Sequence, residues 1–341
     1  MTGSKHADLA KPAIADPAAV ASGRRARALA PWLTPVVLVA IMLLVPYVVG
    51  DNTVHTLQEV LALAVFAAAT NLLLGQAGLV SFGQAVFFGL GAYSVALGWL
   101  HWDFPFWATF VASPFVGAIV AVPVGLIALR ARRWYFALST LAFSQLAYQL
   151  AESRYSFTKG ANGVFGPYIP NQLATNTRIG YFFLLGVGVA SLLLLWKVNH
   201  SSFGLVLRAT RENRDRMQAL GVNVYRHQLV AFVISGGFCS LAGAMFLVFS
   251  QSAYPELLDW TQSGTPVFMA VIGGMGTFLG PVVGAFIYQF GHDRLVLYTS
   301  HWQLVFGAVL ALIIMFWPEG LLGGLGRAVA ALRRRLGERH R

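Results

Sequence analysis

The chain has 341 residues, of which 57% are hydrophobic and only 11% are charged, and its formal net charge is +11. An ordinary soluble domain carries about 25% charged residues, and surface-to-volume scaling leaves it too few interior positions for this much apolar surface. A soluble globular protein is therefore excluded. The single cysteine, Cys239, also excludes a framework of intrachain disulfides.

The predicted elements begin with a basic, disordered tail over residues 1–31, which shows no convincing signal-peptide cleavage site. A membrane-spanning helix needs about 20 mostly apolar residues. Nine hydrophobic segments of suitable length follow, at 32–50, 56–75, 84–100, 106–129, 134–151, 180–196, 228–250, 264–290 and 302–317. A transmembrane domain is thus predicted over residues 32–317, and a second basic tail over residues 318–341 closes the chain.

The positive charges are clustered, which argues against nucleic acid as the partner. Most of the 24 basic residues lie in the two tails, at residues 130–133 and in the polar segment 197–227. Basic loops and tails of membrane proteins usually lie in the cytoplasm. Both termini and the 197–227 segment are therefore predicted to be cytoplasmic, and the number of membrane crossings is predicted to be even.

Nine segments cannot all be single spans if the number of crossings is even. The segment 264–290 is interrupted at residues 273–276 and by Gly280-Pro281, so we expect two short helices, 264–274 and 277–290. Backbone broken at membrane depth is tolerated only where protein or a water-filled cavity covers it. The sequence predicts an all-α integral membrane protein of about ten transmembrane helices, with a broken or re-entrant segment near 264–290. This segment points to a transport path, and a plain glycine hinge is the alternative.

Residues 71–93 combine glycines with polar side chains near membrane depth. Glycine permits close backbone approach, and an unpaired polar group in hydrocarbon is costly. The pattern favours a lining for a polar solute, with helix packing through small residues as the alternative. Candidate path residues from this segment and the 134–151 span are Asn71, Gln76, Ser81, Gln84, Ser139, Thr140 and Ser144.

The segment 197–227 is too polar to cross the membrane. Ser201 or Ser202 can cap the start of a helix, and Gly221 suits a left-handed helix end. A short helix between two spans is well placed to dock another protein. A solvated charged loop is the alternative interpretation.

Several chemistries are missing from the sequence. None of the four lysines is followed by Ser or Thr, so the chain has no Gly-x-x-x-x-Gly-Lys-Ser/Thr loop for ATP phosphates. No His-Glu-x-x-His motif or paired mid-span carboxylates indicate a membrane enzyme. No ionisable side chain lies near the middle of a predicted span, since Glu59 falls near one end of its span. Proton-coupled carriers usually bury ionisable residues in the membrane, so this absence disfavours such a carrier. We expect no bound cofactor or metal.

A series of segments, in this order, resembles a known family. The matching pieces are residues 71–93, 135–143, 158–164, 202–221, 231–244, 272–285 and 318–321. Together they resemble the permease subunits of branched-chain amino acid ABC importers, the LivM-type branch. The resemblance covers roughly residues 35–325 and leaves both tails outside.

The resemblance implies the other parts of an importer. It implies two ATPase subunits that use ATP, a second homologous permease forming a heterodimer, a periplasmic solute-binding protein and a place in the bacterial inner membrane. It also implies that a helix within 201–222 docks on an ATPase. The residues expected to take part are Gly204, Arg208, Arg211, Glu212, Asn213, Ala219 and Gly221.

The resemblance suggests branched-chain or other hydrophobic amino acids as the solute. Two departures bear on it. Lys159 stands where the family usually has glycine, and a glutamate that the family often has near Gln145 is missing. Urea, short amides and aromatic acids are therefore alternative solutes. A stand-alone secondary transporter is a less favoured alternative for the whole machine.

Overall fold

The computed structural model describes residues 42–131, 134–166, 169–170, 173, 175–299, 301–316 and 320–321. The chain forms two compact units, Met1–Val49 and Gly50–Arg341. In the first unit residues 42–48 are helical. The predicted tail 1–31 lies outside the described residues, as does the predicted tail 318–341 apart from Gly320 and Leu321.

The second unit is almost entirely helical, which confirms the predicted all-α membrane protein. Its longer helices are α2 (Asp51–Asn71), α3 (Gln84–Trp102), α4 (Phe106–Ala128), α5 (Trp134–Ser153), α8 (Thr177–His200), α9 (Ser202–Glu212), α11 (Val224–Ser250), α12 (Trp260–Gly273), α13 (Gly280–Tyr298) and α14 (Trp302–Phe316). The short elements are η1 (Leu72–Ala77), α6 (Tyr155–Thr158), η2 (Gly160–Asn162), β1 (Val164–Phe165), α10 (Arg214–Ala219), β2 (Ser252–Ala253) and η3 (Pro255–Leu258).

Five helical segments in the described part of the chain are long and apolar enough to cross a membrane. They are Asp51–Ala77, Gln84–Trp102, Phe106–Ala128, Thr177–His200 and Val224–Ser250. They coincide with five of the predicted spans, and the total of ten crossings stays a prediction. The first of them starts five residues earlier than the predicted span 56–75.

The predicted interruption of the segment 264–290 is confirmed. Helix α12 ends at Gly273, and Gly274 follows with a φ of 114°, which favours glycine. Helix α13 begins at Gly280, and Pro281 occupies its first turn. Proline suits this position because the first N–H groups of a helix have no partner within the helix. Residues 274–279, called here the α12–α13 turn, therefore separate two helices at a place that the sequence marks with glycine and proline.

Helix α2 lies at the centre of the second unit. It packs against α8, α11, α12 and α13, and 94% of the most apolar part of the α2–η1 segment is buried. Residues 61–69 of α2 are apolar, and five of them are alanines. Small side chains let neighbouring helices approach closely, and the resulting van der Waals packing stabilises the association of helices in lipid.

Helices α3 and α11 cross closely, with glycines that face the backbone of the other helix. A Cβ on Gly91 would meet the carbonyl oxygen of Ser240, and a Cβ on Gly243 would meet that of Phe88, each at less than 3.0 Å. Phe88 also packs edge-on against Phe246, with ring centroids 5.5 Å apart. The two glycines therefore fix how close α3 and α11 lie.

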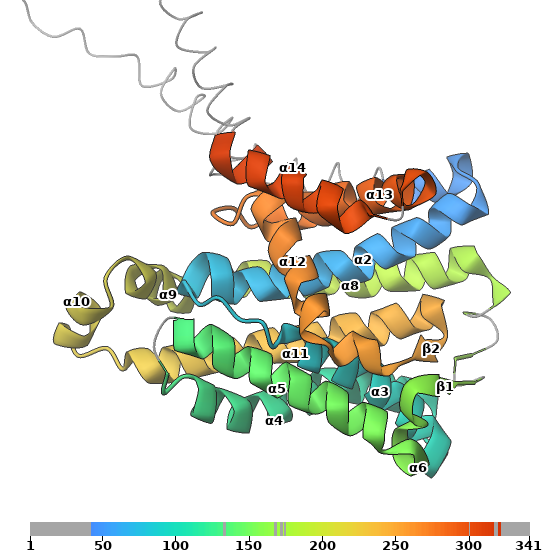
Figure 1. Ribbon diagram of the computed structural model, residues 1–341, viewed down its shortest axis with the longest axis horizontal. Coiled ribbons are helices and arrows are strands. Elements are labelled where there is room, and N and C mark those ends of the chain that lie inside the picture. Colours follow the sequence, from blue (N-terminus) through green and yellow to red (C-terminus); the bar gives the residue numbers. More distant parts are fainter. Residues whose placement is uncertain are drawn as a thin grey trace, which may run out of the picture. The chain divides into compact units, whose positions relative to one another are not determined.

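In Figure 1, α12 runs across the direction of α2, α8 and α11. The Oγ of Ser263 in its second turn accepts a hydrogen bond from the N–H of Ala85, at 2.9 Å. That N–H belongs to the first turn of α3, where backbone donors have no partner within the helix. Ser263 of α12 thus supplies a partner for a backbone donor at the start of α3. Helix α12 then leads into the α12–α13 turn, which lies beside α2.

A short sheet joins two segments that lie far apart in the chain. Strands β1 and β2 are antiparallel, with Val164 opposite Ala253 and Phe165 opposite Ser252. Nearby, burial raises the pKa of the Tyr254 hydroxyl, and the carboxylates of Glu59 and Glu256 raise it further. Tyr254 therefore stays neutral at physiological pH.

Candidate functional site

The predicted docking segment forms two short helices, α9 and α10. The side-chain oxygen of Ser201 accepts a hydrogen bond from the N–H of Gly204, at 3.5 Å, so the predicted serine cap is confirmed. Asn213 caps α10 in the same way, with its Oδ1 2.9 Å from the N–H of Arg216. Gly221 follows α10 with a φ of 82°, as predicted for a left-handed helix end.

Helix α9 has one face against the protein and one face exposed. Gly204, Leu207 and Thr210 are buried, at the three-residue spacing of one helix face. A Cβ on Gly204 would meet the carbonyl oxygen of Asn199 at less than 3.0 Å, so α9 packs tightly onto the end of α8. The exposed side carries Leu205 and Glu212, and Leu205 is 62% exposed.

The end of α2 is a π-helical turn, η1, in which every residue is buried. It ends at Gly78, which has a φ of 68°, and the N–H of Leu79 returns to the carbonyl of Leu73 at 3.0 Å. A π-helix closes each hydrogen bond over one more residue than an α-helix does, and such turns are frequent at functional sites. The last carbonyls of this turn require partners from outside the helix.

Two arginines of α9 supply those partners. The Nη1 atom of Arg211 donates a short hydrogen bond to the carbonyl of Gly75. The Nη1 atom of Arg208 lies 3.5 Å from the Oε1 atom of Gln76. Cations are favourable at the carboxyl end of a helix, where the dipole is negative. Helix α9 is therefore bonded to the end of α2 through charged side chains.

The α12–α13 turn contacts η1 as well. The Nδ2 atom of Asn71 donates to the carbonyl of Thr277, at 3.3 Å. A Cβ on Gly75 would meet the carbonyl oxygen of Met275 at less than 3.0 Å, so the two backbones touch here. The turn residues and the α9 arginines thus meet at one helical turn, and we call this meeting point the η1 junction.

A known family matches most of the chain. Residues 52–316 match the family described as the permease component of the branched-chain amino acid transport system. The chain belongs to this family. The match covers the η1 junction, α9, α10 and both sides of the α12–α13 turn.

Relatives of this permease share low identity over long stretches. It is 24% identical to the LivM permease protein of the high-affinity branched-chain amino acid transport system of Escherichia coli K12, over 84% of this chain and 74% of that protein. It is 28% identical to the probable branched-chain amino acid permease LivH of Methanocaldococcus jannaschii, over 53% of this chain and 58% of that protein. It is 31% identical to the autoinducer 2 import permease LsrC of Salmonella typhi, over 47% of this chain and 45% of that protein. No solved structure matches the chain.

These matches fix the general class of the protein. The relatives are permease proteins of transport systems, and five helical segments of this permease are long and apolar enough to cross a membrane. The chain is therefore a transport subunit located in a membrane.

The permease does not bring the candidate path residues together in one place. Asn71 and Gln76 lie at the η1 junction. Ser81 and Gln84 are buried beside α11, where Gln84 Oε1 accepts from Ser235 and Cys239, each at 3.2 Å. Which of the seven residues line a path stays a prediction.

The three remaining candidates lie on α5. Thr140 is buried, and its Oγ1 accepts a hydrogen bond from the N–H of Phe82 at 3.1 Å. Ser144 is buried and donates to the carbonyl of Leu258 at 2.7 Å. Ser139 is exposed and bonds only to the preceding turn of its own helix, at the carbonyl of Tyr135. Thr140 and Ser144 therefore connect α5 to its neighbours, while Ser139 faces away from them.

Sequence reasoning missed Asn199 and Thr277 at the η1 junction. Asn199 lies within the predicted polar segment 197–227 but in the last turn of α8, and its sequence position indicates only an ordinary polar helix end. Thr277 follows Gly276 in the interrupted segment, where glycines dominate the pattern. The Oγ1 of Thr277 donates to the carbonyl of Gly274 at 3.2 Å and accepts from the N–H of Gly280 at 3.0 Å. It therefore holds the turn closed at the start of α13.

Replacement of Thr277 tests this role. Thr277→Val keeps the shape of the side chain but removes both hydroxyl bonds, and we expect it to lower stability by about 1–2 kcal/mol. Thr277→Ser, which keeps the hydroxyl, is the matched control and should lose less. The measurement is the melting temperature of the purified permease in detergent. Equal melting temperatures for the valine variant and the wild type would contradict the role of the hydroxyl.

Proposed function

We propose that this permease is the membrane subunit of an ATP-driven importer, and that a partner ATPase acts on it through α9 and α10. The observation that carries the proposal is the bonding of α9 to the end of α2 through Arg208 and Arg211. Elsewhere on this segment Leu205 and Leu220 are 62% and 72% exposed. Apolar side chains exposed on a polar segment outside the spans suit a protein partner.

The η1 junction gives the ATPase a route to the spans. A displacement of α9 would carry the guanidinium of Arg211, and with it the carbonyl of Gly75, or else leave that carbonyl unpaired at a cost. The Asn71–Thr277 bond would pass the displacement on to the α12–α13 turn. A π-helical turn is frequent at functional sites, which makes η1 a suitable element to change its arrangement when α9 moves. The result would be alternating access driven from the cytoplasmic side.

The proposed assembly follows the resemblance. It contains two ATPase subunits, a second homologous permease and a periplasmic binding protein, in a bacterial inner membrane with both termini in the cytoplasm. Relatives named LivM and LivH, which are two kinds of branched-chain amino acid permease, support a permease pair. ATP would be used by the partners, and this chain would bind no cofactor itself.

Branched-chain or other hydrophobic amino acids are the solutes that the family supports best. The family description and the LivM relatives carry this assignment. The relative LsrC is named for autoinducer 2 import, so a distant relationship does not fix the solute. Urea, short amides and aromatic acids therefore belong in the same transport assay.

Reconstitution tests the proposed function. The complete assembly is the permease, its partner permease, the ATPases and the binding protein. Proteoliposomes with this assembly should accumulate radiolabelled leucine only when ATP is present in the lumen, on the side of the membrane where the ATPases lie. Liposomes with the permease alone should accumulate none. Uptake by the permease alone, driven by an ion gradient, would overturn the proposal in favour of a secondary transporter. Competition by unlabelled urea, amides or aromatic acids would identify the alternative solutes.

A further inference from the structure

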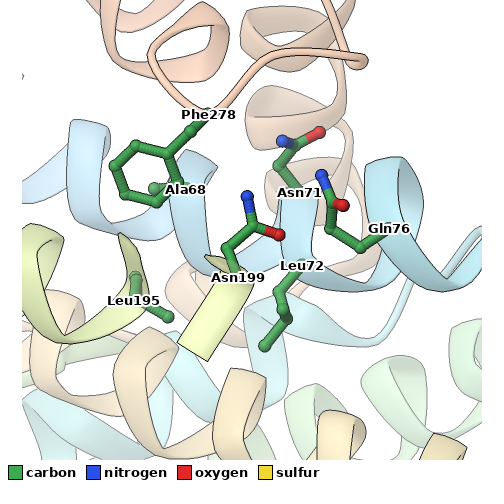
Figure 2. Close-up of a pocket in the computed structure, with 7 residues that line it drawn as sticks. All are labelled: Ala68, Asn71, Leu72, Gln76, Leu195, Asn199 and Phe278. Carbon is green, nitrogen blue, oxygen red and sulfur yellow. The ribbon is translucent and has the colours of Figure 1, made fainter. Parts of the chain in front are cut away.

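A small cavity lies at the η1 junction, on the side of α8. It is lined by Ala68, Asn71, Leu72, Gln76, Leu195, Asn199 and Phe278, and its volume is about 10 Å³. Figure 2 shows the amide groups of Asn71, Gln76 and Asn199 gathered on this space, with Leu195 and Phe278 at its edge. A space of this size holds about one water molecule and is too small for an amino acid.

Two oxygen atoms in this lining have no partner. The Oδ1 atoms of Asn71 and Asn199 are buried without a hydrogen bond to any described residue, and the two side chains are only 3% and 5% exposed. Buried polar atoms in native proteins are nearly always paired, often by an ordered water. Rotating the amide of Asn71 would not help, because its Nδ2 atom already donates to the carbonyl of Thr277. Neither oxygen therefore has a donor among the described residues.

We propose that this cavity is a binding site for one water molecule, which donates to the Oδ1 atoms of Asn71 and Asn199. A monovalent cation could also satisfy two oxygens, but the charges nearby oppose it. The guanidinium of Arg208 bonds to Gln76, which lines the cavity, and none of the seven lining side chains is a carboxylate. A positive charge this close in a poorly solvated site repels a second one strongly. Water supplies two donors without adding charge.

The side chains of Asn71 and Asn199 do not bond to each other directly. The proposed water would therefore link the two helices that carry them, α2 and α8. Asn71 is the last residue of α2, and Asn199 lies in the last turn of α8, two residues before the α9 cap Ser201. The site thus links the start of the α9 segment to α2, and Phe278 of the α12–α13 turn also lines it. The water site depends on the folded chain alone, whatever the permease transports.

A double-mutant cycle on melting temperature tests the site. Asn71→Leu and Asn199→Leu are each expected to lower the melting temperature of the purified permease, because each leaves the other oxygen buried without its donor. The double variant should lose clearly less than the sum of the two, since no orphaned oxygen remains. The Asn71–Thr277 bond is lost in both Asn71 variants and cancels in the cycle. Additive losses would overturn the proposal.

A matched cycle and an ion series complete the test. Asn71→Leu combined with Ser144→Ala, whose hydroxyl bonds to Leu258 instead, should be additive. The melting temperature of the wild type should be the same in sodium, potassium and choline chloride at equal ionic strength. A rise specific to sodium or potassium that Asn199→Leu abolishes would identify a cation and overturn the water assignment. If the variants do not fold, a high-resolution structure of the wild type decides: density about 2.7–3.2 Å from both oxygens is expected, and an empty cavity contradicts the site.

Discussion

Gly91→Ala and Gly243→Ala are each expected to reduce the folded permease recovered from the membrane by about tenfold or more. The added methyl group would meet a backbone carbonyl oxygen across the α3–α11 crossing, that of Ser240 or of Phe88. A backbone oxygen cannot rotate aside as a side chain can, so α3 and α11 would have to separate. Overpacking of this kind costs about 1–3 kcal/mol or more, and about 1.4 kcal/mol is tenfold in an equilibrium.

Gly186→Ala is the matched control for both variants. Gly186 lies within α8, and a Cβ there would meet nothing within 4 Å. Alanine favours a helix by about 1 kcal/mol over glycine, so this variant should be neutral or slightly stabilising. The measurements are membrane yield and melting temperature by size-exclusion chromatography after heating. A Gly91→Ala protein as abundant and as stable as Gly186→Ala would show that the two helices are not held at contact distance.

The helices themselves could largely be predicted, because each long apolar run has only lipid or the protein core to face. The interruption near residue 274 could also be predicted, since glycines and Gly280-Pro281 are written in the sequence. The start of α2 was placed too late. Its first turn contains Asp51 and Asn52, which hydropathy counts against a span, although an acidic residue is favourable at a helix start.

That shift moves Glu59 relative to its helix. The predicted span put Glu59 near an end, but α2 begins at Asp51, so Glu59 lies about 12 Å along the helix axis from that start. On the neighbouring helix α13, Asp293 accepts hydrogen bonds from Thr56 at 3.2 Å and from Gln289 at 2.9 Å. Ionisable side chains therefore occur at this end of α2 and α13, on Glu59 and Asp293, although not near the middle of the predicted spans.

The pairings at the η1 junction could not be predicted. Arg208 lies 132 positions from Gln76 in the chain, and Arg211 lies 136 positions from Gly75. A sequence shows that a side chain is polar, but its partner depends on how distant helices pack. The same limit explains Ser139 and Thr140, which are adjacent in sequence, although only Thr140 is buried. Neighbouring residues on a helix point about 100° apart, and α5 carries polar residues on several sides.

Arg211→Gln is expected to lower ATP-driven uptake by about tenfold or more while the amount of permease in the membrane stays the same. The guanidinium of Arg211 donates to the carbonyl of Gly75, and a hydrogen bond from a charged group contributes about 1.5–3 kcal/mol. Glutamine is shorter and neutral, so the η1 carbonyl would lose its charged partner. Arg226→Gln, at an exposed arginine near the start of α11, is the control and should transport normally.

Glu212→Arg separates docking from transmission. Glu212 is the neighbour of Arg211 and is exposed, and Arg211 is the one of the pair that bonds to η1. If the ATPase docks on this segment, Glu212→Arg should weaken its binding to the permease, measured by pull-down or by interferometry in nanodiscs. Arg211→Gln should leave more of that binding intact but lower the solute moved per ATP hydrolysed. Equal losses of binding in both variants would assign Arg211 to docking alone.

Gly75→Ala tests the η1 junction at its contact with the α12–α13 turn instead of its contact with α9. The added methyl group would meet the Oδ1 atom of Asn71 and the carbonyl of Met275, so it would push the α12–α13 turn away from η1. The arginine bond to the Gly75 carbonyl does not require a glycine, since any residue supplies that oxygen. If Arg211 acts by moving η1 against the turn, Gly75→Ala should also uncouple ATP hydrolysis from uptake, and adding Arg211→Gln should make little further difference. Two independent and additive losses would mean that α9 reaches the spans by another route.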